Sequence, residues 1–103
     1  MMAEATLRRV ARWLRREFPV SAGLGRIRLL PLNDGYYGFT TPGGTIQLNR
    51  DYSRHLQLET LLHEWSHLRV GWKNIDHSQE FWKELGRITN AYHQWREEES
   101  DEE

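Results

Sequence analysis

The sequence predicts a small α+β domain in which one helix is followed by three short strands and two further helices. Two observations lead to this fold class. Three segments, residues 4–18, 53–70 and 78–98, carry apolar side chains at the spacing of one helix face. Between the first two lie short runs of strand-forming residues, separated by turns that contain glycine and proline. The 103 residues have the length of one domain, which we assign to residues 1–98, with an acidic tail over residues 99–103.

The first helix is expected over residues 4–18. Its apolar face is formed by Leu7, Val10, Ala11, Leu14 and Phe18, and arginines occupy half of the other positions. Pro19 lacks the backbone N–H that a further helical turn requires, so we expect the helix to end before it.

Three strands are expected over residues 26–32, 36–41 and 45–49. Asn33-Asp34-Gly35 separates the first two strands and Pro42-Gly43-Gly44 separates the last two, and both tripeptides favour tight turns. Short strands joined by tight turns predict a small, mainly antiparallel sheet.

The second helix, over residues 53–70, has an apolar stripe and is followed by Gly71, a residue type that often ends helices. The stripe consists of Leu58, Leu61, Leu62, Trp65 and Leu68. The third helix is expected over residues 78–98, with Ser78 or Asp76 as its N-cap. Its expected buried side consists of Phe81, Trp82, Leu85, Ile88, Ala91, Tyr92 and Trp95.

The composition restricts the chemistry. The chain has no cysteine, which excludes disulfides, thiolate-bound zinc and a cysteine nucleophile, so any metal ligands must be His, Asp or Glu. Residues 1–20 lack the apolar run of a secretion signal, and no segment approaches a membrane span. We therefore expect a cytoplasmic protein that makes no membrane contacts.

The net charge of −1 conceals an excess of arginine near the N-terminus. Residues 1–30 carry Arg8, Arg9, Arg12, Arg15, Arg16, Arg26 and Arg28. This basic surface is either a solvated helix face or a contact site for nucleic acid or an acidic protein.

His63-Glu64-Trp65-Ser66-His67 is an HExxH motif within the expected second helix. Residues four apart lie on the same face of a helix, so His63 and His67 can bind one zinc ion. Glu64 is displaced by about 100° around the helix, which suits a general base that contacts a metal-bound water. The alternative is that both histidines lie on an ordinary polar helix face.

A catalytic zinc site commonly has three protein ligands, so a further ligand is expected. His77 is the main candidate, because it lies between the end of the second helix and the start of the third. Glu84 is the alternative, together with Glu80 one turn earlier. We expect His55 and His93 to have surface roles. Three tyrosines are expected in the core, with donation to an oxyanion as the alternative; they are Tyr36, Tyr37 and Tyr92.

The strings TLLHEWSHLRV and DHSQEFWKEL together resemble the SprT-like zinc metallopeptidases. In that family HExxH is followed by an H-[GS]-x-x-F segment, whose histidine falls on His77 and whose aromatic residue falls on Phe81. The preceding YYGFTTPGGTIQLNRDY resembles the family's strand pair, so the resemblance covers about residues 36–86. The chain lacks the cysteine zinc ribbon that many members carry.

The resemblance implies a minimal zincin-like domain that binds Zn²⁺ through His63, His67 and His77. Its expected activity is peptide-bond hydrolysis with Glu64 as general base, and its expected partner is a protein or peptide that adds to an exposed edge of strand 45–49. Three alternatives stay open. The chain is a zinc-containing module that binds nucleic acid or protein without hydrolysis, a regulatory protease that cuts one partner, or a hydrolase of another bond.

Overall fold

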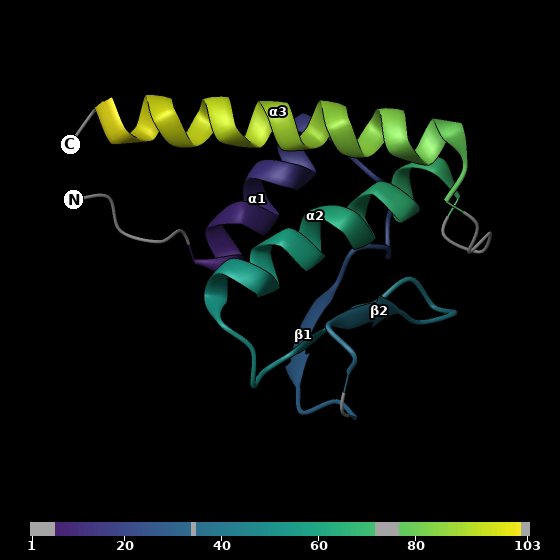
Figure 1. Cartoon of the computed structure of the whole chain (residues 1–103). Helices are drawn as coiled ribbons and strands as arrows, with labels where there is room; N and C mark the ends of the chain where they lie inside the picture. The colour runs from purple at the N-terminus through teal and green to yellow at the C-terminus, as the bar shows by residue number, and fades with distance from the viewer. Residues whose placement is uncertain (1–5, 34, 72–76, 102–103) are drawn as a thin grey trace.

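The computed structural model describes residues 6–33, 35–71 and 77–101, with the side chains of the last two residues left undescribed. The elements follow the expected order: α1 (Leu7–Glu17), β1 (Ile27–Leu30), β2 (Gly38–Thr40), β3 (Ile46–Asn49), α2 (Arg54–Val70) and α3 (Gln79–Asp101). The prediction of an α+β domain is confirmed. The long helix α3 lies along one side of the molecule, and α2 separates it from the sheet (Figure 1).

The helices start and end at residues with clear local causes. The side chains of Thr6 and Ser53 accept backbone N–H groups in the first turns of α1 and α2. The N–H of Phe81 donates to the Ser78 hydroxyl at 3.2 Å, which makes Ser78 the cap of α3; Asp76 lies outside the described residues. Gly71 ends α2 with a φ of 114°, as expected of a left-handed glycine.

The sheet is mixed, and the prediction of a mainly antiparallel sheet is wrong in one pairing. Its strand order is β1-β3-β2, with β1 parallel and β2 antiparallel to β3. The turn at residues 42–44 makes the expected hairpin between β2 and β3. The turn at residues 33–35 does not pair β1 with β2, because β3 carries the fully buried Ile46 and Leu48 and occupies the centre of the sheet.

The strand order also corrects the expected position of the exposed edge. Strand 45–49 is paired on both sides, so it offers no free edge to a substrate. The free edge near the HExxH helix belongs to β2. On either side of this strand, the Tyr37 carbonyl accepts from Asn49 of β3 and the Thr41 N–H donates to Thr45, the residue before β3. The N–H and C=O groups of Gly38 and Thr40 therefore point away from β3.

The core lies between the helices and one face of the sheet. Its largest fully buried side chains are Trp65, Phe81, Leu14, Ile46, Leu48 and Leu61. The buried Gln57 fixes the start of α2 against the end of β3, since its amide donates to the carbonyls of Asn49 and Tyr52 at 3.1 and 3.0 Å. This contact sets the position of the HExxH turns relative to the sheet.

Helix α3 runs past residue 98, where we expect it to end, as far as Asp101. The expected burial of Trp82 on this helix is wrong, since its side chain is 54% exposed while the neighbouring Phe81 takes the buried position. Its distal half contacts α1: the rings of Trp13 and Trp95 stack with centroids 5.0 Å apart, and Arg9 pairs with Glu99. None of the described helices combines the length and apolar character needed to cross a membrane. The cytoplasmic location stays a prediction.

Candidate metal centre

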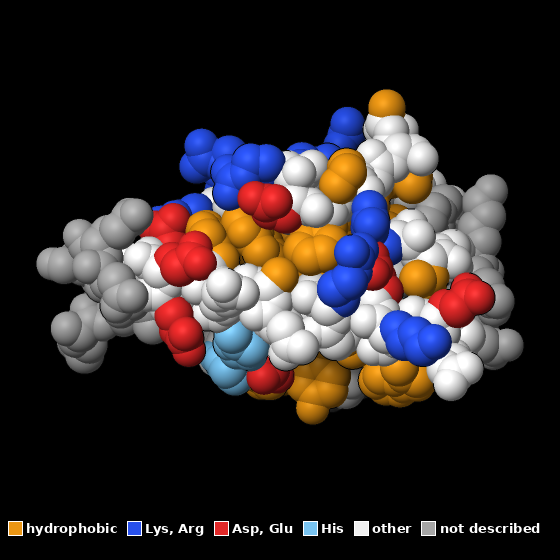
Figure 2. All heavy atoms as spheres, turned by 90° about the horizontal axis from the view of Figure 1, so that it is seen from above, with side chains coloured by type: hydrophobic (Ala, Val, Ile, Leu, Met, Phe, Trp, Pro, Cys, Tyr) orange, Lys and Arg blue, Asp and Glu red, His pale blue; other side chains and the backbone are white. Residues whose placement is uncertain are grey.

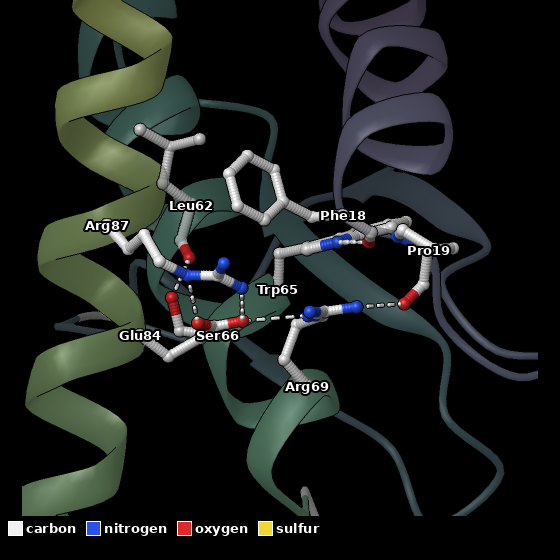
Figure 3. A network of polar contacts seen from close by, with 8 residues as sticks. All are labelled: Phe18, Pro19, Leu62, Trp65, Ser66, Arg69, Glu84 and Arg87. Atoms are coloured by element: carbon white, nitrogen blue, oxygen red, sulfur yellow. Dashed lines mark hydrogen bonds and ion pairs between the residues drawn. The ribbon is translucent and has the colours of Figure 1, made fainter.

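Helix α2 presents the two histidines of the HExxH motif on one side and Trp65 on the other. Trp65 is fully buried and its indole N–H donates to the carbonyl of Phe18 at 2.9 Å (Figure 3). This hydrogen bond and the surrounding leucines fix the rotation of the helix. As a result His63 is half-buried and His67 is buried, with ring centroids 5.1 Å apart.

His77 completes a cluster of three histidines. One nitrogen from each of His63, His67 and His77 lies within 4.8 Å of the others. The ring of His77 is 5.1 Å from that of His63 and 5.0 Å from that of His67, measured between centroids. His77 is exposed and directly precedes Ser78, the residue that caps α3.

Phe81 forms the apolar base of this cluster. Its side chain is fully buried and stacks on His67 with centroids 4.3 Å apart. Its centroid is also 4.7 Å from that of His77 and 5.0 Å from that of His63. One ring therefore contacts all three imidazoles and restricts their rotation.

Glu64 lies beside the histidines, and its two carboxylate oxygens have different surroundings. Oε1 accepts a hydrogen bond from the Thr40 hydroxyl at 2.8 Å. Oε2 lies 3.9 Å from Nε2 of His63 and is therefore the oxygen nearer the cluster. The bond from β2 holds the carboxylate in one orientation, a contact that the motif alone does not reveal.

Burial changes the proton affinity of these groups. It lowers the pKa of His67 to about 4, with a further contribution from the charges of His63 and His77. Burial and the charge of His77 also lower the pKa of His63. Both imidazoles are therefore neutral at pH 7, which is the form that binds metal. Burial raises the pKa of Glu64 despite opposing contributions from Thr40 and His77, which suits proton transfer near neutral pH.

Glu84, the alternative third ligand, is occupied by two arginines. It accepts from Nε of Arg69 at 2.8 Å and from Nε of Arg87 at 2.9 Å, and Arg69 also donates to the Pro19 carbonyl (Figure 3). Burial acts to raise the pKa of Glu84, but hydrogen bonds and charge from the two arginines bring it below its usual value. This network joins α2, α3 and the segment that follows α1. Neither Glu84 nor Glu80 belongs to the described group that could hold a metal.

The other sequence candidates lie elsewhere. His55 is exposed and pairs with Glu59 at 3.1 Å, and His93 is exposed on α3, so neither joins the described histidine cluster. The expected core positions of Tyr36 and Tyr37 are wrong, since the two residues are 57% and 53% exposed. Their loop turns outward because the strand pairing moves β2 to the edge of the sheet.

An open cleft of about 500 Å³ runs between β2 and α2 beside Glu64. It is lined by Gly35, Tyr36, Tyr37, Gly38, Leu56, Glu59, Thr60, His63 and Glu64. One wall is thus formed by the segment that leads into β2 together with Gly38, the first residue of that strand, and the other wall is the HExxH helix. A chain lying in this cleft would pass directly beside the carboxylate.

The residues of the cluster fit a zinc ion. Imidazole nitrogens suit zinc, and a three-histidine set leaves a fourth position open. Zinc-bound nitrogens of a tetrahedral site lie about 3.3 Å apart, so small side-chain movements from the observed spacing are sufficient. The aromatic base and the fixed carboxylate supply the surrounding contacts that such sites have.

The arginine-rich surface is only partly free. Arg9 pairs with Glu99, Arg16 with Glu17, and Arg15 donates to the Gly25 carbonyl. On the face around α3, acidic side chains lie next to basic ones with hydrophobic side chains between them (Figure 2). Binding of nucleic acid through this surface stays a prediction.

Comparisons with protein-family models, with curated proteins and with solved structures found no match to this chain. The SprT-like resemblance, the zinc ion and the hydrolytic activity therefore stay predictions, supported by the residues of the site.

Proposed function

We propose that the protein is a zinc-dependent peptidase of the SprT-like, zincin-like type. The observation that carries the proposal is the convergence of His63, His67 and His77 beside Glu64, at the side of a cleft with a free strand edge. A structural zinc site has four protein ligands and needs no base. A three-histidine set with a carboxylate fixed next to it instead favours hydrolysis.

Each residue of the site has a distinct role in this mechanism. When bound, zinc supplies a water of lowered pKa and a positive charge for the carbonyl oxygen. Through Oε2, Glu64 accepts a proton from the water that attacks the peptide carbon. The Thr40 hydroxyl donates a hydrogen bond to Oε1 and so holds the carboxylate in place. Glu64 then donates the proton to the leaving amine as the C–N bond breaks. The raised pKa of Glu64 favours the first of these transfers, acceptance of the proton from the water.

The substrate is an extended peptide that adds to the free edge of β2. The outward N–H and C=O groups of Gly38 and Thr40 can pair with its backbone. Such a peptide occupies the cleft and brings one carbonyl next to Glu64. The substrate strand thus pairs with β2, and not with β3 as the sequence alone suggests.

The first test is elemental analysis of the untagged wild type and of three variants. We expect about one zinc per chain in the wild type and in Glu84→Ala, and its loss in His67→Ala and His77→Ala. Retained zinc in His77→Ala would contradict the three-histidine site. Because Arg69 and Arg87 lose their partner in Glu84→Ala, the folding of that variant is checked by circular dichroism.

The second test separates hydrolysis from binding. Glu64→Gln is expected to keep its zinc and to lose cleavage of a mixed peptide library followed by mass spectrometry. A variant that cleaves as well as the wild type would refute the role of Glu64. If the zinc-loaded wild type cleaves no library peptide, the hypothesis of a general peptidase gives way to one of two alternatives. These are a zinc-containing binding module and a protease that cuts a single partner.

A further inference from the structure

A second pocket lies between α2 and α3, separate from the cleft at β2. Its floor is mainly apolar: Leu58 and Leu62 come from α2, and Leu85, Thr89 and Tyr92 come from α3. The two α2 leucines are only 7% and 5% exposed and belong to the core, so the floor is fixed by packing. The shape of the pocket is therefore determined by the packing of the core.

One residue of the histidine cluster lies at the boundary between this pocket and the cleft. His63 lines both, and so does Glu59, one turn earlier on α2. His55 and His93 complete the rim, and both are exposed. A ligand at the histidine cluster can therefore reach the apolar floor by passing over His63, without crossing another element.

The size of the pocket limits what it can hold. Its volume is about 260 Å³, below the range of about 300–1,000 Å³ that is typical of pockets for whole small molecules. A single side chain of the size of leucine or phenylalanine fits this volume. The floor has no charged group, since Glu59 and the histidines lie on the rim.

We propose that this pocket binds one apolar side chain of the peptide substrate and so determines cleavage specificity. The inference rests on the proposed function, because it assumes that a substrate lies at the histidine cluster. An acidic side chain is disfavoured, since no Lys or Arg is among the described residues that line the pocket and Glu59 would repel it. A small side chain leaves the floor in contact with water and loses the gain from apolar burial.

Hydroxamic acids test the pocket without any cleavage, because they bind catalytic zinc directly. The probes are acetohydroxamate, 4-methylpentanohydroxamate and 6-aminohexanohydroxamate, titrated calorimetrically into the zinc-loaded protein. We expect the branched alkyl probe to bind about 10- to 100-fold more tightly than acetohydroxamate, since several additional carbons are buried. Equal affinities, or a preference for the ammonium-bearing probe, would overturn the proposal.

Two variants of α3 test whether the preference for the branched probe arises in this pocket. Thr89→Trp fills the pocket and is expected to abolish the advantage of the branched probe, with zinc content unchanged. Asn90→Trp is the matched control: it adds the same side chain at the next position, which is exposed and outside the pocket, so the advantage persists. An advantage that survives in Thr89→Trp, or is lost equally in Asn90→Trp, would overturn the assignment.

A third variant tests the pocket by enlarging it. Leu85 lies partly buried at the floor, and Leu85→Ala is expected to shift the preference from the branched probe to 3-phenylpropanohydroxamate. An unchanged order of affinities would contradict the pocket. Failure of the proposed function gives a different result, because a protein without peptidase activity still shows the probe preference while cleaving no peptide.

Discussion

Replacement of Phe81 by leucine is expected to weaken zinc binding far more than it weakens the fold. Phe81 is fully buried, and its centroid lies 4.3–5.0 Å from those of all three histidines. Leucine retains most of the apolar contact, so the loss of folding free energy is about 1 kcal/mol. It lacks the flat ring that restrains the imidazoles, and loss of such surrounding contacts typically weakens metal affinity about 10- to 100-fold.

The loss of zinc affinity and the loss of folding free energy can be measured separately because the domain stays folded. A stability of about 5–15 kcal/mol leaves a variant that has lost about 1 kcal/mol almost entirely native, so destabilisation alone does not change the measured zinc affinity. The assay is competition for zinc against a chelator of known affinity, together with urea unfolding of the metal-free protein.

Ile88→Val is the matched control for this experiment. Ile88 is also fully buried on α3, and its shortening costs about 0.5–1.5 kcal/mol. It makes no ring contact with the histidines, so its zinc affinity is expected to equal that of the wild type. If Phe81→Leu and Ile88→Val bind zinc equally well, the aromatic base does not organise the cluster and the reasoning fails.

Three further perturbations have outcomes that follow from single contacts. Thr40→Val removes the hydrogen bond to Glu64, and since that bond lowers the carboxyl pKa, the acid limb of the kcat/KM profile is expected to move to higher pH; an unmoved limb would contradict the contact. Below pH 6.5 the unfolded chain protonates His67 before the folded chain does, so the metal-free protein is expected to lose up to roughly 3 kcal/mol between pH 6.5 and about 4. Urea unfolding at pH 7 and pH 4.5 measures this loss of stability. His67→Gln should reduce the pH dependence of the unfolding free energy. The raised pKa of Glu64 acts in the opposite direction. Gly25→Ala places a Cβ 2.7 Å from the buried Trp65 ring at a φ of +82°, and a loss of about 2 kcal/mol or more is expected in the same assay; a neutral change would show that the ring can move.

The sequence predicts the elements better than it predicts their pairing. The helix ends follow from local chemistry, as the caps at Ser78 and Gly71 show. The parallel pairing of β1 with β3 depends on which strand the helices bury most deeply, a property of the assembled domain. Turn signals describe only neighbouring segments, so they place β2 correctly beside β3 and say nothing reliable about β1.

The same distinction applies to the candidate site. The spacing of His63 and His67 is local to one helix, so their shared orientation is predictable from the motif. The Thr40 contact to Glu64 joins positions 24 apart in sequence, and Arg69 approaches Glu84 across 15. Contacts between residues so far apart leave no pattern in the sequence around either residue. Arg69 in the last turn of the second helix indicates that some carboxylate pairs with it, but the sequence does not show that this carboxylate is Glu84.

Helix α3 makes the histidine cluster sensitive to events at the far end of the chain. Its 23 residues span roughly 34 Å, with Phe81 near one end and the Trp95 and Glu99 contacts to α1 towards the other. A helix of this length transmits tilt, so a molecule that displaces α1 from the distal half would alter the restraint on the imidazoles. By thermodynamic reciprocity, metal loading would then change the affinity of that molecule by the same factor. If the cluster binds zinc as proposed, the contact between α1 and α3 would be a point from which metal occupancy is both controlled and sensed.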